Sequence, residues 1–146
     1  MSGTPDDTAH QPSLILDATI LSNFGLVGQL GLLEILTPFR STGWLPVLIP
    51  ESGREQALFV RLISSLGSGE ASCLAIAVSR GMTLATDDLA ARRTACELGV
   101  TLTGALGILV RSVRAAHLPL SNANDILRQM VQLGYRSPVQ DLDGLV

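Results

Sequence analysis

The chain has 146 residues, 47% of them hydrophobic, and a formal net charge of −3. A chain of this length buries roughly 70% of the surface of its unfolded form, so it fits one domain that needs no disulfide or structural metal. All ten basic residues are arginine, which excludes the lysine-dependent Walker P-loops and pyridoxal enzymes and disfavours a response-regulator receiver.

The amino-terminal residues 1–13 are polar and acidic. They lack the basic and apolar regions of a secretory signal, so we expect a disordered lead-in. No apolar stretch reaches the roughly 18 residues of a membrane span, which predicts a soluble protein with no membrane partner. Cys73 and Cys96 have no partners at zinc-site spacing and are interpreted as reduced thiols of a cytoplasmic protein.

The elements expected in the first half follow from hydrophobic periodicity and from glycine and proline positions. They are a buried strand at 14–16, two short helices within 18–36, an edge strand at 44–49, a helix at 51–66, and a central helix that Glu70 opens and Gly81 ends. The strand at 44–49 contains Pro46, which suits an edge position.

The second half continues the same alternation. The expected elements are strands at 83–86 and 100–103 and helices at 89–98, 104–116 and 121–133, the last capped by Ser121 and Asn122. Strands separated by helices favour parallel pairing with right-handed crossovers. The sequence therefore predicts a three-layer α/β/α fold with a parallel central sheet, occupying residues 14–137 and followed by a short tail at 138–146.

Four acidic residues are expected at the carboxyl edge of this sheet, where ligands of parallel α/β folds bind. Asp17 follows the first strand, Asp87 and Asp88 follow the strand at 83–86, and Glu70 lies on the first turn of the central helix. Carboxylates that lie close together repel one another unless a cation compensates. Because Mg²⁺ and Mn²⁺ prefer oxygen ligands, the pattern indicates a metal pocket that can support phosphoryl chemistry.

Each of these residues also has a simpler interpretation. Asp17 and one of Asp87 and Asp88 could serve only as helix N-caps, and Glu70 could only complement a helix dipole. Arg92 and Arg93 follow Asp88 on the same expected helix. They are placed to meet a backbone phosphate, but the default interpretation of exposed arginines on a helix is a solvated face.

Four segments stand in a distinctive order: LDATILSNF at 16–24, LGSGEASCLAIAVSRG at 66–81, LATDDLAARRTACELGVTLTGALGILVRSV at 84–113, and GYRSP at 134–138. This combination resembles the PIN-domain family, in particular its toxin-like (VapC-like) branch. The resemblance implies a metal-dependent endoribonuclease of toxin–antitoxin type that hydrolyses RNA. It further implies an antitoxin protein as partner and a homodimer formed through the apolar helices near the amino terminus.

The family pattern assigns the metal ligands residue by residue. Asp17 matches its first acid, Glu70 the acid of the central helix, and Asp87 or Asp88 the acid after the following strand, with Asp88 favoured as the inner ligand. These residues would hold Mg²⁺ or Mn²⁺, which activates the attacking water.

The sequence departs from the family pattern between Leu36 and Gly43, where a strand and an acidic helix are usually found. The second acid of the family therefore has no clear counterpart, and Glu34, Glu51 and Glu55 are the possible substitutes. Two alternatives to the nuclease hypothesis follow. One is a catalytically weakened domain that binds RNA or a protein, and the other is a purely structural α/β module.

Overall fold

A parallel sheet of three strands forms the centre of the molecule, and its order is β1-β2-β3. The computed structural model describes residues 14–36 and 48–146. The strands are β1 (Leu14–Leu16), β2 (Thr83–Ala85) and β3 (Leu102–Thr103). Leu84 is in register with Ile15 on one side and with Leu102 on the other. Because all pairs are parallel, the carboxyl ends of the strands meet at one edge.

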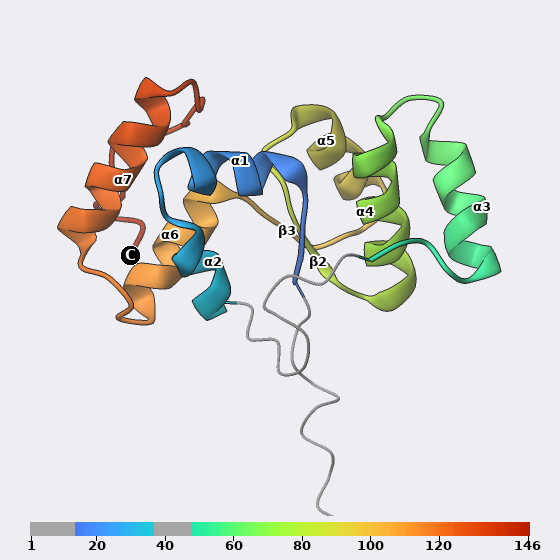
Figure 1. Cartoon of the computed structure of the whole chain (residues 1–146), viewed down its shortest axis with the longest axis horizontal. Coiled ribbons are helices and arrows are strands. Elements are labelled where there is room, and N and C mark those ends of the chain that lie inside the picture. The colour runs from blue at the N-terminus through green and yellow to red at the C-terminus, as the bar shows by residue number, and fades with distance from the viewer. Residues whose placement is uncertain (1–13, 37–47) are drawn as a thin grey trace, which may run out of the picture.

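Helices of the described residues cover both faces of this sheet (Figure 1). They are α1 (Ala18–Leu26), α2 (Leu30–Leu36), α3 (Gly53–Leu62), α4 (Ser68–Arg80), α5 (Leu89–Glu97), α6 (Ala105–Arg114) and α7 (Leu120–Gln132). Helices α1, α2, α6 and α7 form one layer, and α3, α4 and α5 form the other. The predicted three-layer α/β/α fold is confirmed.

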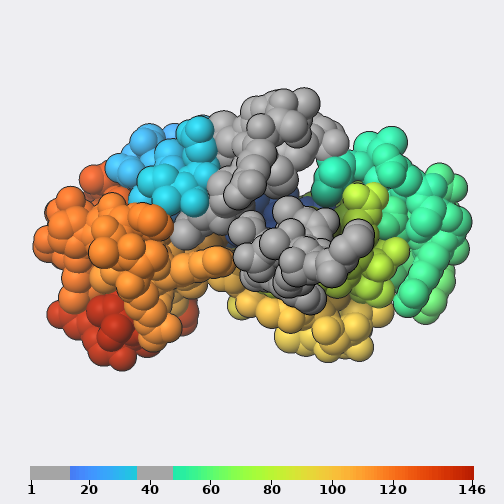
Figure 2. Space-filling model, turned by 90° about the horizontal axis from the view of Figure 1, so that it is seen from below, coloured from blue at the N-terminus to red at the C-terminus, as the bar shows by residue number. Residues whose placement is uncertain are grey.

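Each layer has its own hydrophobic core, because successive strand residues point to opposite faces of a sheet. Ile15 and Leu84 face the core formed with α3, α4 and α5, whereas Ala85 faces the core formed with α1, α2, α6 and α7. Viewed from below, the two helical layers occupy opposite ends of the molecule (Figure 2). The sheet therefore separates two hydrophobic cores.

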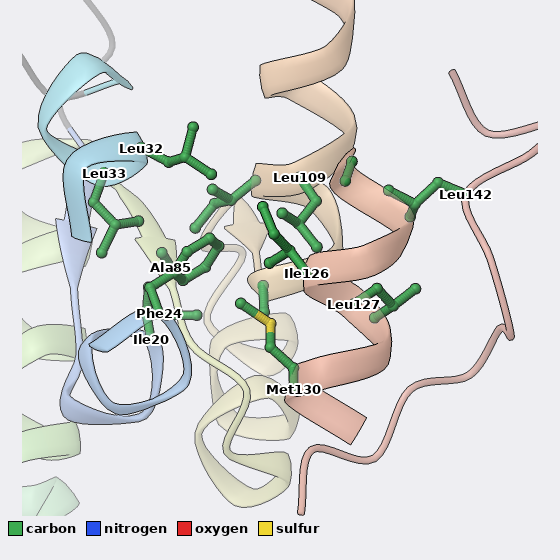
Figure 3. Close-up of a cluster of buried hydrophobic side chains, with 13 residues drawn as sticks. Ile20, Phe24, Leu32, Leu33, Ala85, Leu109, Ile126, Leu127, Met130 and Leu142 are labelled. Carbon is green, nitrogen blue, oxygen red and sulfur yellow. The ribbon is translucent and has the colours of Figure 1, made fainter. Parts of the chain in front are cut away.

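The first core is the larger one and is built around Phe24, which is fully buried. Side chains of α1, α2, α6 and α7 point toward one another there (Figure 3). Leu142, from the segment predicted as a tail, is also fully buried in this core. Asn124 on α7 holds that segment, accepting a hydrogen bond from the Leu142 amide at 2.8 Å. The carboxyl-terminal segment thus packs on the domain.

Two helix ends follow the predicted glycine stops. Gly81 ends α4 with a φ of 65°, and Gly99 follows α5 with a φ of 73°. A left-handed backbone of this kind costs glycine little and other residues more. Of the helices described, none combines the length and the apolar composition required to cross a bilayer.

Several element predictions differ from the structure. Helix α4 begins at Ser68 and not at Glu70, and α3 is shorter than the helix predicted at 51–66. Residues 48 and 49, the described end of the strand predicted at 44–49, lie outside any strand, and residues 44–47 lie outside the described residues. The last helix begins at Leu120 with Pro119 as its N-cap, ahead of the predicted cap at Ser121 and Asn122. Proline has no side-chain hydrogen-bond acceptor, so the helix starts without a side-chain cap.

A buried carboxylate joins α3 to α4. Glu55 accepts hydrogen bonds from the Ser52 and Glu51 amides, completing a capping box at the start of α3. It also accepts two bonds from the Arg80 guanidinium, at 2.9 Å and 3.1 Å. The Arg80 hydrogen bonds are the main cause that lowers the pKa of Glu55 from 4.5 to about 2. The ionised carboxylate therefore holds the two helices together.

This arrangement predicts acid lability. A carboxylate with a depressed folded-state pKa stabilises the fold above its unfolded pKa, and that stability is lost as the pH falls toward the folded value. We expect the thermal midpoint, followed by circular dichroism, to fall between pH 4.5 and about 2 in the wild type. Glu55→Gln should be less stable at neutral pH and lose much of this pH dependence.

The matched control is Glu51→Gln, which removes an exposed carboxylate 3.9 Å from the same arginine. Exposed ion pairs contribute little, so this variant should keep the wild-type pH profile. An unchanged profile in Glu55→Gln would show that the ion pair does not stabilise the fold.

Candidate active site

The first two strands end side by side at the carboxyl edge of the sheet. The Asp17 amide, directly after β1, donates to the Ala85 carbonyl of β2 at 3.1 Å. The turn that contains Asp87 and Asp88 follows β2 immediately and leads into α5. Three of the four predicted acids thus come from two adjacent strand ends.

Asp17 is buried, with 5% of its surface exposed, and caps α1. One carboxylate oxygen, Oδ1, accepts the Thr19 and Ile20 amides at 3.0 Å and 3.3 Å, together with the Thr19 hydroxyl. The other oxygen, Oδ2, accepts the Thr86 hydroxyl. Asp17 is thus the N-cap of α1, and the capping bonds use only Oδ1.

Two threonine hydroxyls connect Asp17 to the turn after β2. The Thr19 hydroxyl accepts the Asp87 amide at 2.9 Å, and the Thr86 hydroxyl accepts the Asp88 amide at 3.1 Å. Each hydroxyl has one proton to donate, and both donate it to Asp17. The backbone of both later acids is therefore fixed relative to the first.

Asp87 points from this turn toward the start of α6. Its Oδ1 accepts the Ala105 amide at 3.0 Å, and its Oδ2 accepts the Asn23 side-chain amide at 2.7 Å. Burial is the main cause that raises the pKa of Asp87, and the Asp17 charge adds to it. The Ala105 amide, Asn23 and Arg92 act in the opposite direction.

Asp88 and Glu70 lie differently. Asp88 is the N-cap of α5 and accepts the Ala91 amide at 2.9 Å. Glu70, in the first turn of α4, has its carboxylate beside Gly67. Burial, then the charges of Asp17 and Glu70, raises the pKa of the Cys73 thiol to about 11. The charges of both acids therefore act on the same thiol. Glu70 comes to this edge of the sheet from the first turn of α4.

The candidate substitutes for the missing second acid lie elsewhere. Glu34 is exposed on α2, and Glu51 is exposed near Arg80. Glu55 is committed to the capping box and the ion pair with Arg80. None of these three comes to the carboxyl edge through a contact of the described residues.

The comparison with known families agrees with this geometry. A family model described as a PIN domain matches residues 37–143, which is well over half of the chain. The chain belongs to the PIN-domain family. PIN domains are nuclease-type proteins that generally depend on a divalent metal ion and commonly bind RNA. No curated protein and no solved structure matches this chain.

The family match includes Glu70, Asp87 and Asp88, whereas Asp17 precedes it. Asp17 is nevertheless tied to the matched region through the Thr86 hydroxyl and the Ala85 carbonyl. The structure therefore brings Asp17, which precedes the family match, next to the matched turn that contains Asp87 and Asp88.

The acids fit a divalent ion in their chemistry and in part in their arrangement. Among the described residues, no group of three or more histidine, cysteine or acidic side chains is gathered as a metal site. Asp17 and Asp87 are linked through the Thr19 hydroxyl, which donates to Asp17 Oδ1 and accepts the Asp87 amide. Because Mg²⁺ is commonly held by one or two carboxylates with several waters, this pair suits it.

A cleft of about 540 Å³ opens beside Asp87. Its walls are the end of β3, the first turns of α5 and α6, and the segment 135–138. Arg92 lines it and donates from Nη1 to the Thr86 and Thr103 carbonyls, at 2.8 Å and 3.1 Å. Arg92 therefore joins the ends of β2 and β3, while Arg93 is exposed and does not line the cleft.

Sequence reasoning missed the residues that hold the acids in place. Thr19, Thr86 and Asn23 bond to Asp17 or Asp87; they stand in the segments that carry the family resemblance, but they were given no role there. Tyr135 and Arg136 were quoted only as part of GYRSP, without a role. Their place beside Asp87 could have been inferred only from the three-dimensional fold.

Gly104 has no Cβ, which allows the Asp87 carboxylate to approach the start of α6. Replacing this glycine should therefore lower the stability of the protein. A Cβ added there would lie 2.5 Å from Asp87 Oδ1 and 3.1 Å from Arg92 Nη1. Its backbone is extended, with φ −153° and ψ −170°, so alanine would clash without straining the backbone. We expect Gly104→Ala to lower the free energy of urea unfolding by about 1–3 kcal/mol.

Gly69→Ala is the matched control. Nothing lies within 4 Å of a Cβ added at Gly69, which is inside α4. Alanine is favoured over glycine in a helix, so this variant should be as stable as the wild type or more stable by up to about 1 kcal/mol. Equal stabilities of the two variants would contradict the close approach at Gly104.

Tyr135 reports on the charge of Asp87. It is the only tyrosine of the chain, so phenolate absorbance belongs to it alone. Burial and then the Asp87 charge raise its pKa, opposed by the Leu106 amide and Arg92. In a metal-free buffer, Asp87→Asn should therefore lower the pKa of Tyr135. A pKa equal to or above the wild-type value would place Asp87 away from the phenol.

Proposed function

We propose that this PIN domain is a metal-dependent endoribonuclease of toxin type that hydrolyses RNA phosphodiesters. The observation that carries the proposal is the pair Asp17 and Asp87, which are linked through the Thr19 hydroxyl, with Asp87 lining a cleft that also contains two arginines. Carboxylates placed beside a basic cleft combine a site for a divalent cation with a place for phosphate.

In this proposal Asp17 and Asp87 are the inner carboxylates for Mg²⁺ or Mn²⁺. Glu70 completes the site from α4, and Asp88 supports it as the cap of α5. The sequence favoured Asp88 as the inner ligand, but its carboxylate accepts the Ala91 amide of its own helix. Asp87 instead points toward Asn23 and the start of α6, beside the cleft.

The residues of the chain position the reaction. Thr19 and Thr86 orient the Asp17 carboxylate. Three hydrogen bonds occupy Oδ1, whereas Oδ2 accepts only the Thr86 hydroxyl and keeps a lone pair for another partner. A bound divalent ion would supply an activated water and neutralise charge on the phosphodiester. Because the pKa of Asp87 is raised, Asp87 loses its proton at a higher pH than an ordinary aspartic acid. Cation binding should therefore strengthen as the pH rises through the pKa of Asp87.

The cleavage test compares Mn²⁺, Mg²⁺ and EDTA on a labelled RNA, read on a denaturing gel. We expect cleavage with the metals, none in EDTA, and a loss of at least about 100-fold in Asp17→Asn. Asparagine is a good N-cap, so this variant should keep helix α1. Metal-independent cleavage, or full activity of Asp17→Asn, would refute the nuclease proposal.

Asp125→Asn is the matched control for this test. Asp125 is exposed on α7 and pairs with Arg128, away from the acids of the site. Removing its charge leaves the carboxyl edge unchanged. Its cleavage rate should equal that of the wild type, so a comparable loss would indicate a general effect of charge.

The second candidate function is an RNA- or protein-binding module with weakened catalysis. It is favoured by the lack of a group of three acids gathered for a metal among the described residues. It is also favoured by the use of Asp17 and Asp88 as helix caps. RNA that is bound but not cleaved in either metal is the result that selects this function.

The protein partners and the location of this protein are also part of the proposal. An antitoxin protein would cover the acidic edge and keep RNA out. A homodimer would use α1 and α2, where Leu26, Leu30 and Ile35 are exposed. A cytoplasmic location is supported by Cys73 and Cys96, which are free thiols.

A further inference from the structure

The carboxyl-terminal segment 135–146 forms no helix or strand, yet it is held along the side of α7. It leaves α7 through Gly134, whose φ of 112° turns the chain back. Figure 3 shows the segment returning along α7 as far as Leu142. Its first residues, 135–138, form one wall of the cleft beside Asp87. The position of this wall therefore depends on how the segment is anchored.

The first anchor lies next to the wall. The Tyr135 amide donates to the Met130 carbonyl near the end of α7, at 2.9 Å. The side chains of Tyr135 and Val139 are half-buried and pack against the first core. The Ser137 hydroxyl donates to the Val139 carbonyl at 2.6 Å and accepts the Val139 amide at 3.2 Å. These contacts shape the wall and hold its beginning.

The second anchor lies near the start of α7 and uses both ends of one side-chain amide. Asn124 accepts the Leu142 amide with Oδ1 at 2.8 Å and donates from Nδ2 to the Asp143 carboxylate at 2.9 Å. One partner is a donor and the other an acceptor, so an amide side chain satisfies both at once. Leu142 is fully buried, and beyond it Arg114 of α6 donates to the Leu145 carbonyl at 2.6 Å.

The two anchors close residues 135–142 into a loop. Met130 and Asn124, which accept the two anchoring amides, are six positions apart and so roughly 9 Å apart along the helix axis. The seven steps from 135 to 142 can reach roughly 23 Å when extended. The loop is therefore longer than the direct route, and its extra length passes by the cleft at 135–138. Releasing one end of such a loop frees the residues between the anchors.

We propose that Asn124 is a positioning residue for the candidate active site. By holding Leu142 and Asp143 near the start of α7, it keeps residues 135–138 in place at the wall beside Asp87. Asn124 does not line the cleft itself and acts through the segment. The inference rests on the proposed nuclease activity where it concerns a substrate, and on the contacts of the segment where it concerns the wall.

Release of the segment should affect substrate binding more than the chemical step. Asp17 and Asp87 accept hydrogen bonds from α1, from the Thr86 hydroxyl and from the first amide of α6. These contacts remain when the segment moves, whereas the wall beside Asp87 does not stay in place. A displaced wall weakens the binding of a substrate that occupies the cleft, which raises KM with little change in kcat.

An exchange of the two partners tests the second anchor. Asn124→Asp replaces the donor that faces Asp143 by a second carboxylate, and the two like charges repel. Asp143→Asn alone keeps an oxygen that accepts from Asn124. The double variant, Asn124→Asp with Asp143→Asn, again places a donor opposite a carboxylate and keeps an acceptor for the Leu142 amide. Only Asn124→Asp alone should therefore release the segment.

Hydrogen exchange read by mass spectrometry follows the wall without any substrate. In Asn124→Asp, the amides of 135–142 should exchange faster by roughly tenfold or more, because two hydrogen bonds are lost. The amides of 126–132 in α7 should keep their wild-type rates, and both other variants should match the wild type throughout. Unchanged exchange at 135–139, equal acceleration in α7, or no rescue in the double variant would each overturn the proposal.

Cleavage kinetics in Mn²⁺ connect the wall to the site. Asn124→Asp should raise the KM for a labelled RNA roughly tenfold and leave kcat within about twofold of the wild type, and the double variant should restore KM. A wild-type KM in Asn124→Asp, or a loss in kcat alone, would overturn the positioning role. Absence of cleavage by the wild-type protein would refute the nuclease proposal instead, and hydrogen exchange would still decide whether Asn124 positions the wall.

Discussion

The Asp17 carboxylate, with the two threonine hydroxyls that donate to it, is the interaction on which the rest of this edge depends. A buried carboxylate is costly unless hydrogen bonds satisfy it, and here backbone amides and hydroxyls do so. Because each hydroxyl gives its proton to Asp17, only its lone pairs remain for the amides of Asp87 and Asp88. One ionised group thus sets the direction of bonds in two separate turns.

The chain of contacts continues from Asp87 to the third strand. Its carboxylate takes the first amide of α6, which is possible because Gly104 has no Cβ. Asn23, on α1, holds the other oxygen. The bonds that fold the three strand ends together are therefore the same bonds that hold the acids, and a variant of either acid tests stability as well as activity. This overlap explains why conservative asparagine variants are the informative ones.

Local sequence patterns predicted most of the fold. The strand at 14–16, the helix stops at Gly81 and Gly99, and the parallel order follow from periodicity and glycine positions. The beginning of α7 was predicted one residue late because the helix starts after Pro119, which offers no capping side chain, whereas the prediction relied on Ser121 and Asn122 as caps. Burial of Leu142 was missed because residues 138–146 form no helix or strand, so the apolar residues of this segment have no regular face that a sequence pattern could assign to the core.

The candidate site was predictable in its acids but not in their roles. Position after a strand or at a helix start suffices to choose Asp17, Glu70, Asp87 and Asp88. Which oxygen faces which partner depends on contacts between residues more than sixty positions apart, such as Thr86 with Asp17 at a separation of 69. Such contacts leave no trace in a local window. The metal-ligand assignment remains a prediction for the same reason.

Arg92 shows how the lack of lysine bears on the site. One nitrogen of its guanidinium spans two carbonyls at the ends of β2 and β3, while the rest of the group lies at the cleft. The planar fork of arginine can bond in several fixed directions at once, whereas a lysine ammonium is a compact charge on a flexible stem. A lysine at this position could meet the carbonyls or a phosphate, but it could not hold both in a fixed geometry. A single arginine side chain thus joins the ends of β2 and β3 and also places a positive charge beside Asp87. This charge lowers the pKa of Asp87, which would be raised further without it.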